Sequence, residues 1–155
     1  MEEQRDRAGV IFPPPAVALL ALIAAIAFDH FWPLPIAPRS VAVVLGTLFS
    51  LFGVGIAAWG RALLVRGGTN VNPYKPTTAI IRSGPYRFTR NPLYVGLQSL
   101  LVGLSLLIGT WWGIVLLVPT FLILHYGVVR REEAYLQRKF GQEYLSYKSQ
   151  VRRWL

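Results

Sequence analysis

The sequence predicts an all-α membrane protein with about four transmembrane helices, the last two forming a tight hairpin, followed by a cytoplasmic amphipathic helix. Hydrophobic residues make up 54% of the 155 residues and charged residues only 15%, whereas soluble domains usually carry about a quarter charged residues. The mean hydropathy is +0.44. The charged residues are also collected between long apolar stretches. The whole chain is therefore expected to form a single membrane domain.

The first two predicted helices are long enough to cross a bilayer, for which about 20 apolar residues suffice. The first covers 16–32 and follows three prolines, which are tolerated at a helix start because the N–H they lack would have no intrahelical partner. The second covers 41–65, and its glycines permit close approach of a neighbouring helix. These glycines are Gly46, Gly53, Gly55 and Gly60.

The last two helices are predicted from one long uncharged stretch. No Asp, Glu, Lys or Arg occurs from Leu93 to Val129, and one helix of that length, at about 1.5 Å per residue, would be nearly twice as long as the bilayer core. The sequence "IGTWWG" in its middle combines helix-breaking glycines with tryptophans suited to the interface. We therefore predict helices over 93–108 and 111–129, with a re-entrant arrangement or a locally thinned bilayer as the alternatives.

The distribution of Lys and Arg predicts the orientation of these helices. Basic residues gather in the N-terminal segment (Arg5 and Arg7), in the loop 66–92 and in the tail 130–155, whereas the first loop contains only Arg39 and the hairpin tip none. Because loops rich in Lys and Arg stay in the cytoplasm, both termini are expected there. The chain is then an integral membrane protein, of the cytoplasmic membrane if bacterial.

The net charge of +9 is therefore attributed to loops that face anionic lipid headgroups. Nucleic-acid binding is not expected, because the basic residues form no continuous soluble face. Cysteine is absent and only two histidines occur, which argues against thiolate catalysis and predicts no metal site.

The hairpin is expected to bring two polar segments together at the cytoplasmic surface. The motif "GPYRFTRNPLYVG" (84–96) precedes the hairpin, and Glu132 and Glu133 follow it. We therefore expect 87–94 to lie close to the two glutamates. A site made of both segments could carry out chemistry that neither could perform alone.

The motif itself has the features of an anion-binding turn. Asn91 is a suitable N-cap and Pro92 a suitable first residue for the helix that follows. Arg87 and Arg90 place cations near the helix N-terminus, whose free N–H groups also attract anions. The alternative is an interfacial turn whose arginines bind lipid phosphate.

The tail offers candidates for catalysis and for membrane docking. His125 precedes Glu132 by seven residues, so helical spacing puts both on roughly one face, and either His125 or a glutamate could act as a general base. Alternatively, Glu132 and Glu133 belong to a solvated helix turn and have no chemical role. Further on, a helical stripe predicts an amphipathic helix that lies on the membrane. It consists of Tyr144, Tyr147, Val151 and Trp154.

Two sequences together, "GPYRFTRNPLYVG" and "REEAYLQRKFGQEYLSYKSQVRRWL", resemble the isoprenylcysteine carboxyl methyltransferase and phospholipid methyltransferase superfamily of integral-membrane enzymes. The resemblance covers about Gly67 to Arg153. Asn91 stands where the carboxyl methyltransferases usually have histidine, and Asn-Pro here is similar to the phosphatidylethanolamine methyltransferases and many small bacterial members. The segment 67–69 falls where the phospholipid enzymes carry a glycine-containing cofactor segment.

The resemblance implies a methyltransferase that uses S-adenosyl-L-methionine, bound at the cytoplasmic end of the hairpin without a Rossmann sheet. It implies an activity like that of isoprenylcysteine carboxyl methyltransferase on a lipophilic or membrane-associated acceptor. The candidate catalytic residues are Glu133, His125 and Arg87. The candidate cofactor-binding residues are Gly68, Thr69, Tyr86, Arg87, Arg90, Asn91, Pro92, Tyr94, Gly96, Glu132 and Glu133.

The methyl acceptor and the oligomeric state stay open at this point. A prenylcysteine carboxylate, a phospholipid amine, and a small thiol or other hydrophobic metabolite are all compatible with the sequence. A non-catalytic membrane protein that binds lipid headgroups or a partner through its basic loops is the alternative outside enzymes. A transporter is disfavoured, because the first two helices have few ionisable residues to line a polar path.

Overall fold

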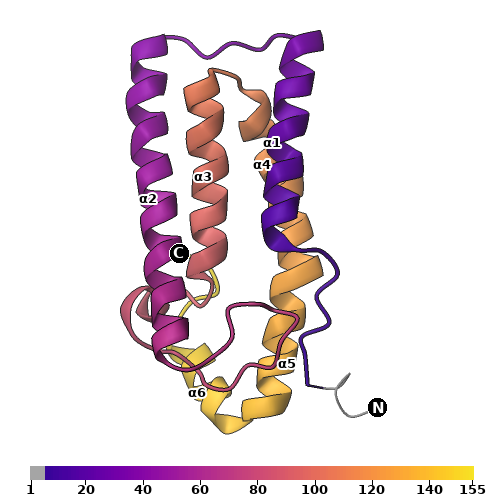
Figure 1. Cartoon of the computed structure of the whole chain (residues 1–155), viewed down its shortest axis with the longest axis vertical. Helices are drawn as coiled ribbons and strands as arrows, with labels where there is room; N and C mark the ends of the chain where they lie inside the picture. Colours follow the sequence, from indigo (N-terminus) through magenta and orange to yellow (C-terminus); the bar gives the residue numbers. More distant parts are fainter. Residues whose placement is uncertain (1–5) are drawn as a thin grey trace.

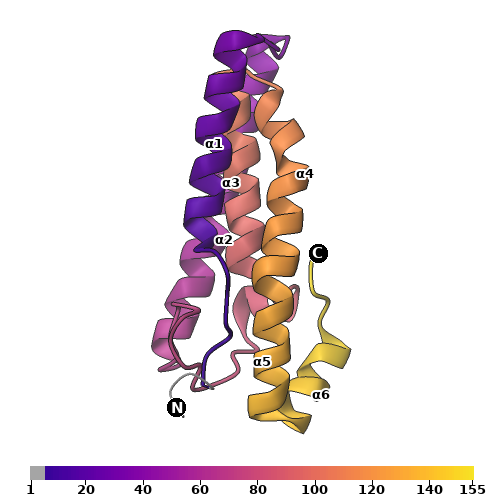
Figure 2. The ribbon, with the colours of Figure 1, turned by 90° about the vertical axis from the view of Figure 1, so that its right-hand side faces the viewer.

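The computed structural model describes residues 6–155, and helices dominate this part of the chain, which confirms the predicted fold class. Four helices stand side by side as a bundle (Figure 1, Figure 2). They are α1 (Pro14–Phe31), α2 (Arg39–Arg66), α3 (Pro92–Ile108) and α4 (Trp112–Leu124). The other helical segments are the 3₁₀ turn η1 (Gly84–Arg87), the π-helical turn η2 (His125–Val129), α5 (Arg130–Phe140) and α6 (Gln142–Gln150). Arg5, one of the basic residues from which the orientation is predicted, lies outside the described residues.

Three helices are long and apolar enough to cross a membrane, namely α1, α2 and the continuous helix Trp112–Phe140. The helix α3 has 17 residues, which corresponds to about 25 Å at the usual rise per residue. Exposed leucines, isoleucines and valines cover much of α1 and α2. Such an apolar surface is stable in contact with lipid tails.

The structure differs from the prediction at the membrane exit of the last helix. The helix predicted over 111–129 does not end at Val129, because α4, η2 and α5 follow one another without a break to Phe140. The residues that follow Val129 are good helix formers. The helix ends only at Gly141, whose φ of +51° is readily adopted by glycine.

The predicted amphipathic helix in the tail is wrong in two respects. The helix α6 ends at Gln150, and Val151 is already extended, so neither Val151 nor Trp154 belongs to a helical stripe. Tyr144 and Tyr147 do lie on one helix face, but they are buried against Tyr86 of the motif. Helical spacing identifies an apolar face, and it does not show whether protein or lipid covers that face.

Glycines bring α2 and α3 into backbone contact. A Cβ atom added to Gly53 would lie 2.6 Å from the carbonyl oxygen of Gly96, and one added to Gly46 would lie 2.9 Å from that of Gly103. The prediction of close helix contact therefore holds for these positions. Gly55, by contrast, faces open space, with nothing within 4 Å of an added Cβ.

Arg39 fixes the end of the bundle that carries the hairpin tip. Its guanidinium group donates hydrogen bonds to the carbonyl oxygens of Leu106 (3.0 Å) and Leu107, the last carbonyls of α3. A cation is favourable at a helix C-terminus, where the carbonyls lack intrahelical partners. Thr110 in the tip donates to Asp29 at the end of α1 (2.7 Å), so the tip is held from both sides.

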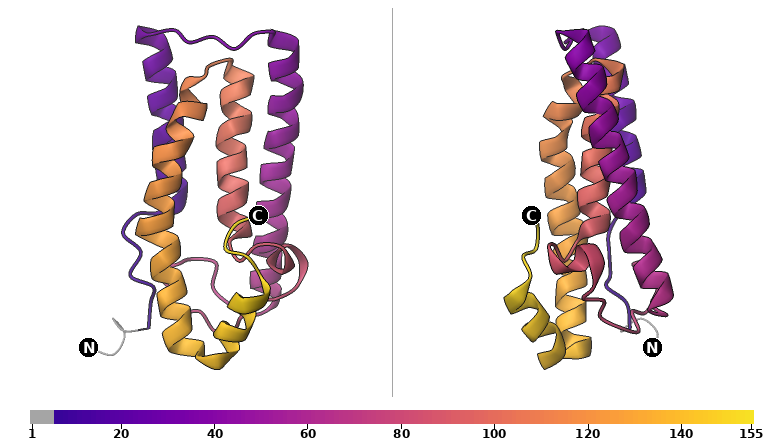
Figure 3. Two further views of the ribbon diagram at one scale, coloured as in Figure 1. Left: turned by 180° about the vertical axis from the view of Figure 1, so that it is seen from behind. Right: turned by 90° about the vertical axis from the view of Figure 1, so that its left-hand side faces the viewer.

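The other end of the bundle, called the polar end below, collects the segments between and beyond the helices. It contains residues 6–13, the loop 67–91, α5 and α6 (Figure 3). The N-terminal segment packs there against the last helix, because Ala8 and Val10 share a core cluster with Leu124 and Val128. The N–H of Ile11 also donates to the carbonyl oxygen of Gly127 (3.1 Å).

We predict that Gly53→Val destabilises the fold far more than Gly55→Val. The side chain at position 53 would collide with the α3 backbone, and overpacking of this kind typically lowers the free energy of unfolding by about 1–3 kcal/mol. Both substitutions change helix propensity equally, so position 55 is a matched control. Thermal unfolding of the two variants in detergent measures the difference, and equal melting temperatures would contradict the packing described here.

Candidate functional site

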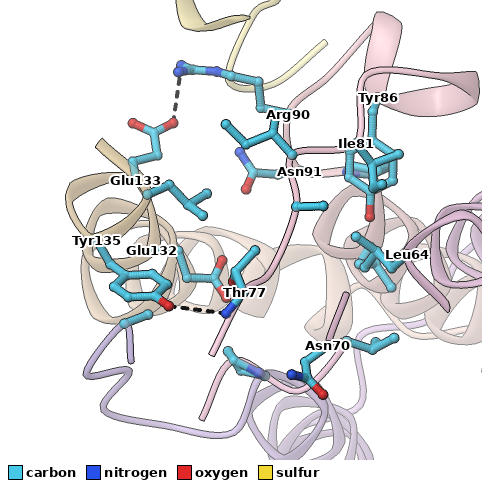
Figure 4. A pocket seen from close by; sticks show the side chains of 18 of the residues that line it. Leu64, Asn70, Thr77, Ile81, Tyr86, Arg90, Asn91, Glu132, Glu133 and Tyr135 are labelled. Carbon is cyan, nitrogen blue, oxygen red and sulfur yellow. Dashed lines mark hydrogen bonds and ion pairs between the residues drawn. The ribbon is translucent and has the colours of Figure 1, made fainter. Parts of the chain in front are cut away.

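A pocket opens at the polar end, where the end of α2, the loop 67–91, the start of α3, α5 and α6 meet (Figure 4). Its cavity volume is about 130 Å³, and the cavity is open to solvent at its mouth. Its polar lining residues are Asn70, Asn72, Thr77, Tyr86, Arg90, Asn91, Tyr94, Glu132, Glu133, Tyr135, Tyr144 and Tyr147.

The motif reaches this pocket through a sharp turn. Gly84 has a φ of +58°, a conformation that glycine adopts readily, and η1 follows directly. Pro92 begins α3, and Asn91 occupies the N-cap position, as predicted. The Asn91 side chain makes no capping hydrogen bond, however, and its Nδ2 donates instead to the carbonyl oxygen of Arg153 (2.8 Å).

A buried ion cluster joins the motif to the last helix. Nη2 of Arg90 lies 3.1 Å from Oε1 of Glu133, and both side chains are less than a tenth exposed. Arg153 contacts the same carboxylate through Nε (2.9 Å to Oε1) and Nη2 (2.7 Å to Oε2). A carboxylate at this depth is stable only when it is paired and hydrogen-bonded.

The ion cluster carries a surplus of positive charge, because two guanidinium groups surround one carboxylate. Within residues 6–155, Nε and Nη1 of Arg90 are buried and have no hydrogen-bond partner. Buried donors of this kind are costly unless an acceptor satisfies them. Arg90 is therefore well suited to bind an anionic group in the pocket.

Glu132 supplies a second carboxyl group to the pocket. The hydroxyl of Tyr94 donates to its Oε1 (2.7 Å). Among the described residues, no Lys, Arg or His forms an ion pair with Glu132, in contrast to Glu133. The pocket therefore contains a cationic group with unused donors and a carboxyl group that forms no ion pair among the described residues.

Three tyrosines form an aromatic wall together with aliphatic residues of α2 and the loop. Tyr86, Tyr144 and Tyr147 are buried in one cluster, and the hydroxyl of Tyr147 donates to the carbonyl oxygen of Tyr86 (2.7 Å). The hydroxyl of Tyr86 is buried without a partner among residues 6–155 and points toward Leu64 of α2 (Figure 4). It is a second buried donor without a partner among these residues.

These phenols are donors and not bases at neutral pH. Burial, followed by the negative charge of Glu133, raises the pKa of Tyr144 to about 12. Burial also raises the pKa of both Tyr86 and Tyr147 above its ordinary value. Because burial disfavours the charged phenolate, the wall stays neutral and retains its hydroxyl protons.

The loop 67–91 closes one side of the pocket and is fastened to α5. The N–H of Thr77 donates to the hydroxyl of Tyr135 (3.1 Å), and that hydroxyl donates to Asp6 of the N-terminal segment (2.9 Å). Asn70 and Asn72 of the loop also line the pocket. None of these residues is predicted from the sequence, because the loop has no periodic pattern and its asparagines are ordinary turn residues.

Seven of the residues predicted for the site meet in the pocket. The contacts between Arg90 and Glu133 and between Tyr94 and Glu132 show that the hairpin brings the motif to the double glutamate. The seven residues that line the pocket are Tyr86, Arg90, Asn91, Pro92, Tyr94, Glu132 and Glu133.

Four predicted cofactor-binding residues do not line the pocket. Arg87 is exposed at the end of η1, and its side chain has no hydrogen bond or ion pair within the described part of the chain. Gly96 faces α2, where an added Cβ would lie 2.6 Å from the carbonyl oxygen of Gly53. Gly68 is exposed. Thr69 is buried, but its Oγ1 accepts a hydrogen bond from the Thr78 N–H (3.0 Å) and so shapes the loop.

His125 also lies outside the pocket lining. Its ring stacks on Phe121, with 5.7 Å between centroids, and its Nδ1 accepts a hydrogen bond from the indole of Trp154 (3.3 Å). The turn η2 lies between His125 and Glu132. Because a π-helical turn contains more residues than an α-helical one, the seven-residue spacing does not place the two side chains on one face.

The comparisons with known proteins agree with this architecture. Residues 41–143 match the family model described as phospholipid methyltransferase, a stretch that covers α2, the motif, the hairpin, α5 and the start of α6. An uncharacterized protein of Haemophilus influenzae is 38% identical over 66 residues, which are 41% of this chain and 100% of that protein. No solved structure matches the chain. With two thirds of its residues matched to the family model, the chain belongs to the phospholipid methyltransferase family.

Proposed function

We propose that this protein is an integral-membrane methyltransferase that uses S-adenosyl-L-methionine to methylate a lipophilic or membrane-associated acceptor. Membership of the family supports methyl transfer as the chemistry. The observation that supports the choice of cofactor is the pocket, in which Arg90 has unused buried donors beside a wall of tyrosines.

The residues of the pocket match the chemical groups of S-adenosyl-L-methionine. A guanidinium group binds a carboxylate through charge-assisted hydrogen bonds, so Arg90 would hold the carboxylate of the cofactor. The aromatic wall offers flat faces for the adenine ring. When bound, S-adenosyl-L-methionine supplies an electrophilic methyl group.

The main contribution of the chain to catalysis is positioning. Alignment of the reacting groups can account for about 7–11 kcal/mol of a reaction barrier in favourable cases. The ion cluster fixes the motif to the last helix, and the Tyr135 hydroxyl fixes the loop to α5. These contacts hold two walls of the pocket in fixed positions.

The structure supports the proposed orientation of the protein. The N-terminal segment from residue 6, the loop and the two last helices lie at the polar end, together with most of the Lys and Arg residues. Because basic segments remain in the cytoplasm, we assign the polar end to that side. Arg39, the first residue of α2, is the exception at the opposite end, and its guanidinium group caps the C-terminus of α3.

Glu132 favours an amine among the possible acceptors. An ammonium headgroup would be attracted to its charge, whereas a prenylcysteine carboxylate would be repelled by it. An ammonium group must also lose a proton before its nitrogen can attack a methyl group, and Glu132 lies in the pocket, where it can accept that proton. A phospholipid amine is therefore the acceptor class that the site fits best.

We expect membranes that contain the protein to transfer radiolabelled methyl groups from S-adenosyl-L-methionine to a solvent-extractable lipid. Glu132→Gln should lower the rate by at least tenfold, because the amide has neither the charge nor the basicity of the carboxylate. Mass spectrometry of the labelled product identifies the acceptor. A rate unchanged in Glu132→Gln would contradict the role proposed for this residue.

Arg90→Ala should weaken the binding of S-adenosylhomocysteine by about tenfold or more, since hydrogen bonds to charged groups typically contribute about 1.5–3 kcal/mol. Arg87→Ala removes the same charge from an exposed position three residues away and should change the affinity by less than about twofold. Isothermal titration of the purified variants measures both.

The same titration separates an enzyme from a protein that only binds lipid headgroups. If the wild type does not bind S-adenosylhomocysteine and shows only salt-sensitive affinity for anionic lipid, the non-catalytic alternative is correct. Equal losses in Arg87→Ala and Arg90→Ala would also be incompatible with the pocket as the cofactor site.

A further inference from the structure

The last five residues of the chain form a strap over the motif. The segment 151–155 leaves α6 and runs back along the bundle (Figure 2). Three of its contacts are to the motif: the Arg90 N–H donates to the Arg152 carbonyl oxygen (2.9 Å), and Thr89 Oγ1 (3.1 Å) and Asn91 Nδ2 (2.8 Å) both donate to the Arg153 carbonyl oxygen. The strap is therefore fixed by the residues that line or flank the pocket.

The strap is also fastened to the last helix. The indole of Trp154 donates to His125 (3.3 Å), and the Arg153 guanidinium contacts both carboxylate oxygens of Glu133. A bidentate guanidinium–carboxylate pair is the most specific geometry available for this contact. The backbone of Arg153 thus binds the motif while its side chain binds α5.

Arg153 and Arg90 both contact Glu133, but they do so with different numbers of nitrogen atoms. Arg153 directs two nitrogens at the carboxylate, whereas Arg90 reaches it only through Nη2, at 3.1 Å. Nε and Nη1 of Arg90 have no partner within residues 6–155. Arg153 already donates hydrogen bonds to both oxygens of Glu133. Arg90 therefore does not need to direct all of its guanidinium N–H groups at that carboxylate.

From this division of contacts we infer that Arg153 is a positioning residue, which occupies Glu133 and thereby keeps part of the Arg90 guanidinium free to bind an anionic ligand group. The inference rests on the proposed function, in which that group is the carboxylate of S-adenosyl-L-methionine. Without Arg153, both oxygens of Glu133 would be open to Arg90, whose Nη2 already lies 3.1 Å from that carboxylate. Arg90 would then turn toward Glu133 and bind the cofactor carboxylate poorly.

A purely structural role for Arg153 makes a different prediction. If the ion pair only held the fold together, its loss would weaken every ligand of the pocket to a similar extent. If Arg153 acts through Arg90, the loss is confined to ligands that carry the carboxylate. Two ligands that differ only in this group, S-adenosyl-L-methionine and its decarboxylated form, therefore distinguish the two roles.

The experiment is isothermal titration of the full-length protein in detergent with both compounds, without an acceptor. For Arg153→Gln we expect S-adenosyl-L-methionine to bind about ten- to a hundredfold more weakly than to the wild type, as for the loss of a charge-assisted hydrogen bond. The affinity for the decarboxylated form should change by less than about threefold. Arg152→Gln is the matched control, because it removes the same charge from an exposed neighbouring side chain and should leave both affinities unchanged.

Two further variants complete the test. Arg153→Lys keeps the charge but loses the bidentate contact, so we expect an intermediate loss for S-adenosyl-L-methionine. In Arg90→Gln the carboxylate contact is already absent, so adding Arg153→Gln should cause no further loss for S-adenosyl-L-methionine. Additive losses would show that Arg153 acts independently of Arg90 and would overturn the inference.

The outcomes separate this inference from the proposed function. If the wild type binds S-adenosyl-L-methionine but Arg153→Gln weakens both compounds equally, or neither, the positioning role is refuted while the cofactor assignment stands. If the wild type binds neither compound, the proposed function fails and the inference fails with it. Retained binding of the decarboxylated form by Arg153→Gln also demonstrates that this variant is folded.

Discussion

The buried carboxylate of Glu133 is the point on which the architecture of the polar end depends. It receives Arg90 from the motif before the hairpin and Arg153 from the end of the chain, so three segments far apart in sequence converge on one side chain. Removal of one partner from a buried ion pair typically costs about 3–5 kcal/mol. The cluster can therefore keep the walls of the pocket in register while lipid surrounds the rest of the bundle.

The bundle supplies the rigid support for this cluster. Glycines of α2 and α3 let the two backbones touch, and Arg39 together with Asp29 fixes the hairpin tip at the opposite end. In lipid, where helix association has no hydrophobic driving force, close packing of small residues and polar contacts must supply it. Contacts along the whole length of α3 thus hold its first turn in place. Tyr94 lies in that turn, and Arg90 comes just before it.

The sequence predicts the helices and the meeting of the motif with the double glutamate, because these depend on hydropathy, charge and the length of the uncharged segment. It does not predict which side chains point into the pocket. Arg87 and Arg90 look equivalent in the motif, and only the 3₁₀ turn makes one exposed and the other buried. The π-helical turn likewise separates His125 from Glu132, and the tyrosines of α6 face protein instead of lipid because the chain folds back at Gly141.

The central claim is that the pocket between Arg90 and Glu132 holds S-adenosyl-L-methionine at the cytoplasmic end of the bundle. The most direct test is an experimental structure of the full-length protein in lipid with S-adenosylhomocysteine at saturating concentration. We predict density for the ligand in this pocket, with its carboxylate at Arg90. Ligand density elsewhere on the protein, or an empty pocket at saturation, would contradict the account.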